Sequence, residues 1–188
     1  PRGVKKSLEK YVWRNEEDFD SFLRDTSLIR KFTYNEEKEE DVIQIREKDY
    51  SFFLYNQIDT ANYELIFWNT QSILPEETLL MNDSTNYIKS LTNGQYQVIK
   101  KRLNTGSKNS LALYLLPIRR QYVLESEYLR NGFVNQSNLE DSYSLSFAPT
   151  DFPIRSKTGE TLFYLQPKPF SDAEGYDWVT LLFRVAGA

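Results

Sequence analysis

The feature that most constrains the fold is an unbroken apolar run at residues 111–116, with the sequence LALYLL. A polar turn, NTGS, precedes the run at residues 104–107, and Pro117 follows it. A short apolar run bounded by turn residues is typical of a strand that is buried on both faces. We therefore predict a buried strand here, with Leu113 and Leu115 among the most buried residues of the protein.

The segments before this run supply the rest of a sheet. Residues 50–55 and 63–68 are aromatic and β-prone, and the polar turn between them predicts a hairpin. Asn93-Gly94 is a tight-turn signal that leads into a strand over residues 95–101. The order of these segments predicts three or four antiparallel strands arranged as a meander.

Helices are predicted on both sides of this sheet region. An apolar stripe with a spacing of three and four residues predicts a long helix over residues 4–28, and a shorter helix is predicted over 36–48. A third helix is predicted over 122–133. Two further strands are predicted over 143–147, which alternates polar and apolar residues, and over 161–165.

These elements predict an α+β fold in which a long N-terminal helix packs on an antiparallel sheet. The expected organisation is one domain overall: a helical region over 1–48, a sheet core over 49–170, and a linker with a juxtamembrane tail over 171–188. The apolar part of the tail is shorter than the roughly 20 residues that span a bilayer. It suits either a last core strand or the approach to a membrane helix.

The amino-acid composition says more about the chemistry that the chain can perform than about its fold. The 188 residues contain no cysteine and no histidine, which excludes thiolate or imidazole catalysis and zinc–sulfur sites. No pair of carboxylates forms a catalytic motif, and no phosphate-binding or calcium-binding loop is present. The net charge of −4 and the lack of interleaved basic and aromatic residues argue against nucleic-acid binding. We therefore expect no enzyme activity, no metal and no cofactor.

Two groups of residues remain as candidates for binding. Aromatic side chains such as Trp68, Tyr87 and Tyr96 could line a pocket for a planar or sugar-like ligand, although such residues more often form sheet core. Arg119 and Arg120 follow the buried strand and could clamp an anionic ligand. Pairing of these arginines with an acidic residue of the following segment, Glu125 or Glu127, is the simpler alternative.

Several short motifs, taken in order, resemble the extracytoplasmic sensor domain of membrane-bound histidine kinases from Bacteroidetes-type bacteria. The resemblance covers most of the chain. The motifs are EEDF at 16–19, LIFWN at 65–69, NGQY at 93–96, LPIRRQY at 116–122, EYLRNGF at 127–133 and GETLF at 159–163.

The resemblance implies a PAS-related architecture of the PDC/Cache-like type. It also implies a periplasmic domain of an inner-membrane protein, flanked by two membrane helices, the second of which leads to a cytoplasmic kinase core. The kinase core lies outside this chain, so the chain would not phosphorylate anything by itself. A homodimer in the full-length protein is expected, and the signal would be a small molecule or a periplasmic protein.

For a sensor, the expected ligand site lies between the sheet and residues 69–91, which predict a loop long enough to form a lid. The residues expected there are Trp68, Tyr87, Tyr96 and Arg119. An exported protein that captures a glycan or a peptide is the alternative function. A carboxylate-dependent hydrolase is a weaker third.

Overall fold

The sheet expected around residues 111–116 is the centre of the protein. The computed structural model describes residues 2–60, 62–106, 108–122, 124, 130–134 and 139–168. Within these residues, six strands form the main sheet in the order β2-β1-β5-β4-β3, and β6 pairs with the end of β5. The strands, all paired in antiparallel fashion, are β1 (Ser51–Gln57), β2 (Tyr63–Trp68), β3 (Asn86–Leu91), β4 (Gly94–Asn104), β5 (Asn109–Arg120) and β6 (Gly132–Phe133).

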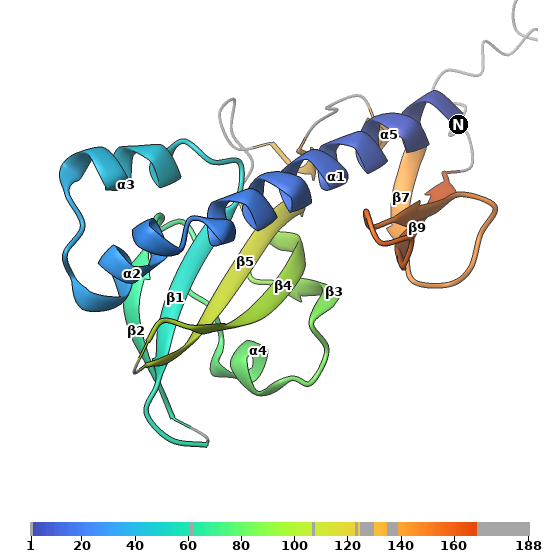
Figure 1. The fold of residues 1–188 in the computed structure, drawn as a ribbon. Helices are drawn as coiled ribbons and strands as arrows, with labels where there is room; N and C mark the ends of the chain where they lie inside the picture. The colour runs from blue at the N-terminus through green and yellow to red at the C-terminus, as the bar shows by residue number, and fades with distance from the viewer. Residues whose placement is uncertain are drawn as a thin grey trace, which may run out of the picture.

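The apolar strand β5 lies between β1 and β4 (Figure 1). Leu113 and Leu115 have no exposed surface, as predicted. The predicted hairpin of β1 and β2 is also confirmed, but the meander order is wrong. A strand that is apolar on both faces is best placed inside a sheet, with a neighbour on each edge, so β5 inserts between the two earlier hairpins.

The long N-terminal helix packs on one face of this sheet. Helix α1 (Arg2–Arg24) buries Leu8, Val12 and Phe19 completely or nearly so. The ring centroid of Phe19 lies 4.8 Å from that of Tyr114 on β5. The structure therefore confirms an α+β fold with a long N-terminal helix on an antiparallel sheet.

The first predicted helix is two helices in the structure, because the chain breaks at Asp25. The carboxylate of Asp25 accepts a hydrogen bond from the backbone N–H of Leu28 (3.0 Å) and so caps the second helix, α2 (Thr26–Tyr34). Helix α3 (Glu39–Arg46) occupies the middle of the range predicted for it.

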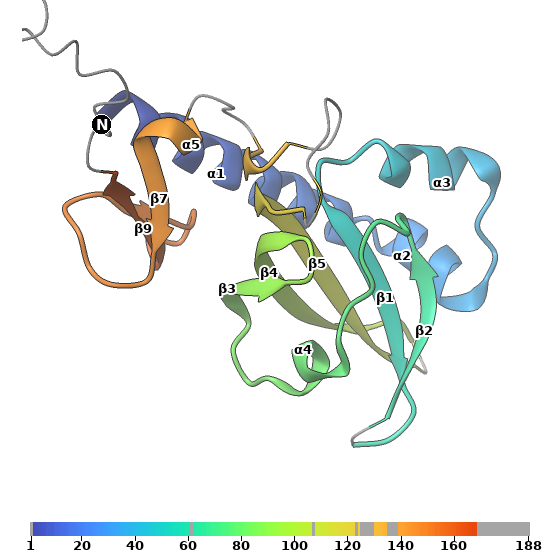
Figure 2. The same cartoon turned by 180° about the vertical axis from the view of Figure 1, so that it is seen from behind.

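A second, smaller sheet lies near the N-terminal end of α1. It consists of β7 (Tyr143–Ser146), β8 (Pro153–Arg155) and β9 (Thr161–Pro167) in the order β7-β9-β8, preceded by the short helix α5 (Leu139–Ser142). The two predicted strands in this region are confirmed. Helix α1 runs along both sheets, as both views show (Figures 1 and 2). The expected sheet core over 49–170 thus contains two separate sheets.

The face of the main sheet opposite α1 is covered by the segment that follows β2. The prediction of a loop over 69–91 is wrong in part, because α4 (Glu77–Met81) and β3 both lie in it. Strand β3 is an edge strand with half-exposed side chains, so it lacks the apolar pattern that identifies a buried strand.

The helix predicted over 122–133 falls largely outside the described residues. Its described positions, Tyr122, Leu124 and residues 130–133, are not helical, and Gly132–Phe133 forms β6. The expected tail at 171–188 also lies outside the described residues. In the described part of the chain, no helix is long and apolar enough to cross a membrane.

Candidate functional site

The four residues expected to bind a ligand do not meet in one place. Trp68 ends β2 at one edge of the main sheet, and Tyr87 lies on β3 at the other edge. Tyr87 and Tyr96 lie on neighbouring strands and contact the same apolar cluster. Arg119 is near the end of β5. The structure therefore brings Tyr87 and Tyr96 together and separates them from Trp68.

The space expected for the ligand, between the sheet and residues 69–91, is filled by apolar side chains. Ile73 and Leu79, from the covering segment, pack with Phe53, Leu113 and Tyr96 of the sheet, and all five are buried. Burial here also raises the pKa of Tyr55, on the same cluster, to about 12. This region is a second core and leaves little room for a molecule.

Arg119 holds an ion pair within the protein. Its guanidinium donates to both carboxylate oxygens of Glu140, with distances of 2.9 and 2.8 Å, and Lys168 lies 3.3 Å from the same carboxylate. Burial alone would raise the pKa of Glu140, but the hydrogen bonds and charges of the two cations outweigh it and hold that pKa below its usual value. Glu125 and Glu127, the partners considered from the sequence, lie outside the described residues.

A pocket of about 410 Å³ opens at one end of the main sheet, close to Tyr96. Four segments surround it: the start of β1, the end of β5, the β3–β4 turn and the chain just after β2. We call it the polar pocket, because most of its lining side chains carry hydrogen-bonding groups. The lining residues are Arg46, Lys48, Asp49, Tyr50, Ser51, Asn69, Thr70, Ser72, Asn93, Tyr96, Pro117, Arg120 and Tyr122.

Two asparagines hold the walls of the polar pocket in place. The side chain of Asn69 accepts a hydrogen bond from the backbone N–H of Phe52 (2.8 Å) and donates to the carbonyl oxygens of Ile45 (2.8 Å) and Tyr50 (3.1 Å). Asn93 accepts a hydrogen bond from the Tyr96 hydroxyl (2.8 Å) and donates to the carbonyl oxygen of Ser72 (3.2 Å). The pocket is thus preformed by internal hydrogen bonds.

The wall of the polar pocket is bonded directly to α1. Asp18 accepts hydrogen bonds from the Lys48 ammonium (2.7 Å) and from the Tyr50 hydroxyl (2.9 Å). Burial, with the nearby charge of Asp18, raises the pKa of Tyr50, so its hydroxyl keeps the proton that it donates.

Two more bonds join the pocket to earlier turns of the same helix. Arg14 donates to the carboxylate of Asp49 (2.5 Å), and the hydroxyl of Tyr11 donates to the carbonyl oxygen of Pro117 (3.2 Å). Positions 11, 14 and 18 are three and four residues apart and therefore lie on one face of α1. The pocket wall is therefore bonded to one face of α1 over several turns.

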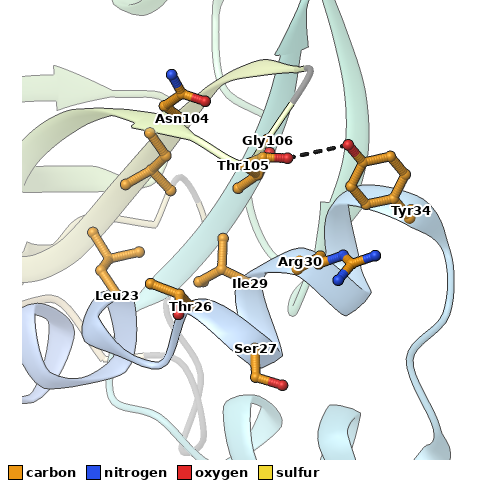
Figure 3. Close-up of a pocket in the computed structure, with 10 residues that line it drawn as sticks. Leu23, Thr26, Ser27, Ile29, Arg30, Tyr34, Asn104, Thr105 and Gly106 are labelled. Atoms are coloured by element: carbon orange, nitrogen blue, oxygen red, sulfur yellow. Dashed lines mark hydrogen bonds between the residues drawn. The ribbon is translucent and has the colours of Figure 1, made fainter.

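A second pocket, of about 510 Å³, lies between the α1–α2 junction and the β4–β5 turn (Figure 3). Leu23 and Ile29 give it an apolar side, and the Tyr34 hydroxyl closes one end by donating to the carbonyl oxygen of Thr105 (3.1 Å). Of its lining residues, Leu23 alone belongs to α1. We regard the polar pocket as the better candidate, because it is the one bonded to several turns of α1.

The sequence pointed to two residues of the polar pocket, Tyr96 as a ligand-binding aromatic residue and Arg120 as a possible anion clamp, but not to the pocket as a whole. Arg46, Lys48 and Asp49 lie just before β1, and Arg120 ends β5. Because β1 and β5 are antiparallel, the start of one and the end of the other meet at the same end of the sheet. The charged residues at these two strand ends could have indicated the pocket. They do so only once the pairing of β1 with β5 is known.

The chain matches no family model, no curated protein and no solved structure. Among the described residues, no group of three or more acidic side chains is placed to hold a metal ion.

Proposed function

We propose that the chain is the extracytoplasmic sensing domain of a membrane-bound histidine kinase, with the polar pocket as the ligand site and α1 as the element that carries the signal. The observation that carries the proposal is the set of bonds from Lys48, Asp49, Tyr50 and Pro117 to one face of α1. A pocket that only stores or captures a ligand does not need such bonds to a helix.

The course of α1 supports this role. The helix runs first along the small sheet, where the Trp13 indole N–H donates to the carbonyl oxygen of Arg155 (2.8 Å), and then along the main sheet. The beginning of α1 and the end of β9 lie at the same end of the molecule (Figures 1 and 2). This arrangement suits a domain whose two connections enter one membrane.

The fold also suits the proposal. A long N-terminal helix on an antiparallel sheet fits the PAS-related, PDC/Cache-like architecture that the sequence motifs resemble. In this proposal the domain is periplasmic, belongs to an inner-membrane protein that functions as a homodimer, and has no catalytic activity of its own.

A ligand would act by binding one conformation of the pocket wall better than another. Moving a two-state equilibrium from 1:99 to 99:1 takes about 5.5 kcal/mol of such preference. The Asp18 and Asp49 ion pairs are the contacts through which this preference would reach α1.

The full reading frame gives the first test. We expect a membrane helix on each side of this chain and a kinase core after the second. A reading frame without them would refute the proposal and favour the exported binding protein.

The second test separates ligand binding from signal transfer. In the full-length kinase, Asp18→Asn should reduce the change in autophosphorylation that ligand causes, while ligand affinity of the isolated chain should change by only a few-fold. Asp20→Asn is the matched control, because Asp20 lies on the same helix but pairs with Lys101, outside the pocket. Equal effects of the two substitutions would contradict a route through Asp18.

A further inference from the structure

We infer that the polar pocket binds a small organic acid, whose carboxylate is received by Arg46 and Arg120. This inference rests on the proposed function in taking the polar pocket as the ligand site, and it adds the chemical class of the ligand. The charged side chains of the pocket differ in whether they already have a partner of opposite charge.

Two of the charged lining residues are neutralised by α1. Lys48 is paired with Asp18, and Asp49 is paired with Arg14. These pairs hold the wall and leave neither charge free for a ligand.

The two arginines of the pocket are not neutralised in this way by any described residue. Arg120 donates to the Tyr122 hydroxyl (2.9 Å), a neutral partner that orients the guanidinium without compensating its charge. Arg46 is exposed and has no hydrogen bond or ion pair with any of the described residues. The pocket thus contains two guanidinium groups without a carboxylate partner among the described residues.

Guanidinium groups bind carboxylates through paired, charge-assisted hydrogen bonds. The rest of the lining suits the polar body of such a ligand, because Tyr96, Tyr122 and Asn93 add groups that can donate or accept hydrogen bonds. A volume of about 410 Å³ lies within the range of pockets that hold small molecules.

The first experiment compares acids with their neutral amides. The isolated chain is titrated with succinate and glutamate, with succinamide and glutamine as uncharged counterparts, and with inorganic phosphate. At saturation, at least one of the acids should raise the melting temperature by about 2–4 °C or more. The amides should leave it unchanged, and phosphate should bind more weakly than the acid.

The second experiment locates the site. Arg46→Gln and Arg120→Gln should each weaken binding of the acid by roughly ten- to hundred-fold, the loss expected for a charged hydrogen bond. Arg102→Gln is the matched control: Arg102 is also exposed and lines a different pocket, beside Tyr63 and Asn109. Circular dichroism of the variants confirms that they fold, which is expected because both pocket arginines are exposed.

Three results would overturn the inference: no binding by either acid, equal binding of acid and amide, or equal weakening by Arg46→Gln and Arg102→Gln. Binding of phosphate alone is a case of the first result, and it would indicate an anion site without preference for an organic acid.

The inference and the proposed function can fail separately. An acid that binds at Arg46 and Arg120 in a protein whose reading frame lacks a kinase core would leave the inference standing and refute the sensor. A full-length kinase whose ligand response is unchanged in both arginine variants would refute the inference and leave the sensor function standing.

Discussion

Gln97 on β4 donates a 2.5 Å hydrogen bond to the carboxylate of Glu16 on α1, and both side chains are buried. The same carboxylate accepts from the backbone N–H of Lys157 (2.6 Å), in the turn between β8 and β9, and from the side chain of Asn86 on β3 (3.5 Å). Glu16 therefore joins the helix, the main sheet and the small sheet at one point.

Glu16→Gln should destabilise the protein by about 1–3 kcal/mol, because an amide has one acceptor oxygen where the carboxylate uses two. The measurement is urea unfolding followed by circular dichroism. Glu17→Gln is the matched control, because Glu17 is the next residue of the helix and forms an exposed ion pair with Lys157. Its effect should stay within about 0.5 kcal/mol. Equal losses in the two variants would contradict the structural role of Glu16.

Leu113→Ala should cost about 2–5 kcal/mol, because this side chain is fully buried in the cluster opposite α1 and its removal leaves a cavity. Denaturant unfolding measures the loss. Leu74→Ala removes the same atoms from a side chain that is 80% exposed, so it should change stability by no more than about 0.5 kcal/mol. A loss below 1 kcal/mol at position 113 would show that β5 is not central.

The ion pair of Arg119 with Glu140 should make stability depend on pH. The pKa of Glu140 is held below its ordinary value of 4.5 in the folded protein, so the contribution of this pair is complete above that value. It is lost as the pH falls from about 4.5 through the folded pKa.

The difference in unfolding free energy between the wild type and Glu140→Gln measures this contribution. It should be about 1–2 kcal/mol at pH 7 and should shrink towards pH 3. Glu64→Gln, on the exposed side of β2, controls for the loss of one negative charge. A difference that is constant from pH 7 to pH 3 would contradict the prediction.

Gly94 is required at the β3–β4 turn. Its φ angle is +149°, and a Cβ atom there would lie 2.1 Å from the carbonyl oxygen of Arg119 on β5. Gly94→Ala should therefore cost about 1–3 kcal/mol and displace the end of β5, next to Arg120. Gly3→Ala places the same methyl group in open space on α1 and should be neutral or slightly stabilising. Melting temperatures of the two variants test the contrast.

The parts of the fold that could be predicted from sequence are those encoded by neighbouring residues. The apolar run at 111–116 identifies β5, and the spacing of Leu8, Val12 and Phe19 identifies α1. The strand order was predicted wrongly, because the pairing of β5 with β1 joins segments that are far apart in the chain, and no local motif specifies it. Strand β3 was missed because its exposed edge position imposes no apolar pattern.

The polar pocket could not be predicted for a related reason. Arg46 and Arg120 are far apart in the chain. Arg120 was considered with Arg119 as a possible anion clamp, but no local pattern links it to Arg46. They line one pocket because Ser51 is paired with Leu115 in the sheet, which places the start of β1 beside the end of β5. Tyr96 was identified because aromatic residues were considered as a class, and it is the one of the four expected residues that lines the pocket.

The position of β5 between β1 and β4 also determines when the sheet can form during synthesis on the ribosome. The β1–β2 and β3–β4 hairpins can each form locally, but they are joined only when residues 109–120 have emerged. Until then β1 and β4 each present an unpaired edge, which invites association with other chains. A chain that ends before residue 109 lacks β5, so its two hairpins are not joined and its pocket is incomplete. We expect such truncated products to aggregate or be degraded.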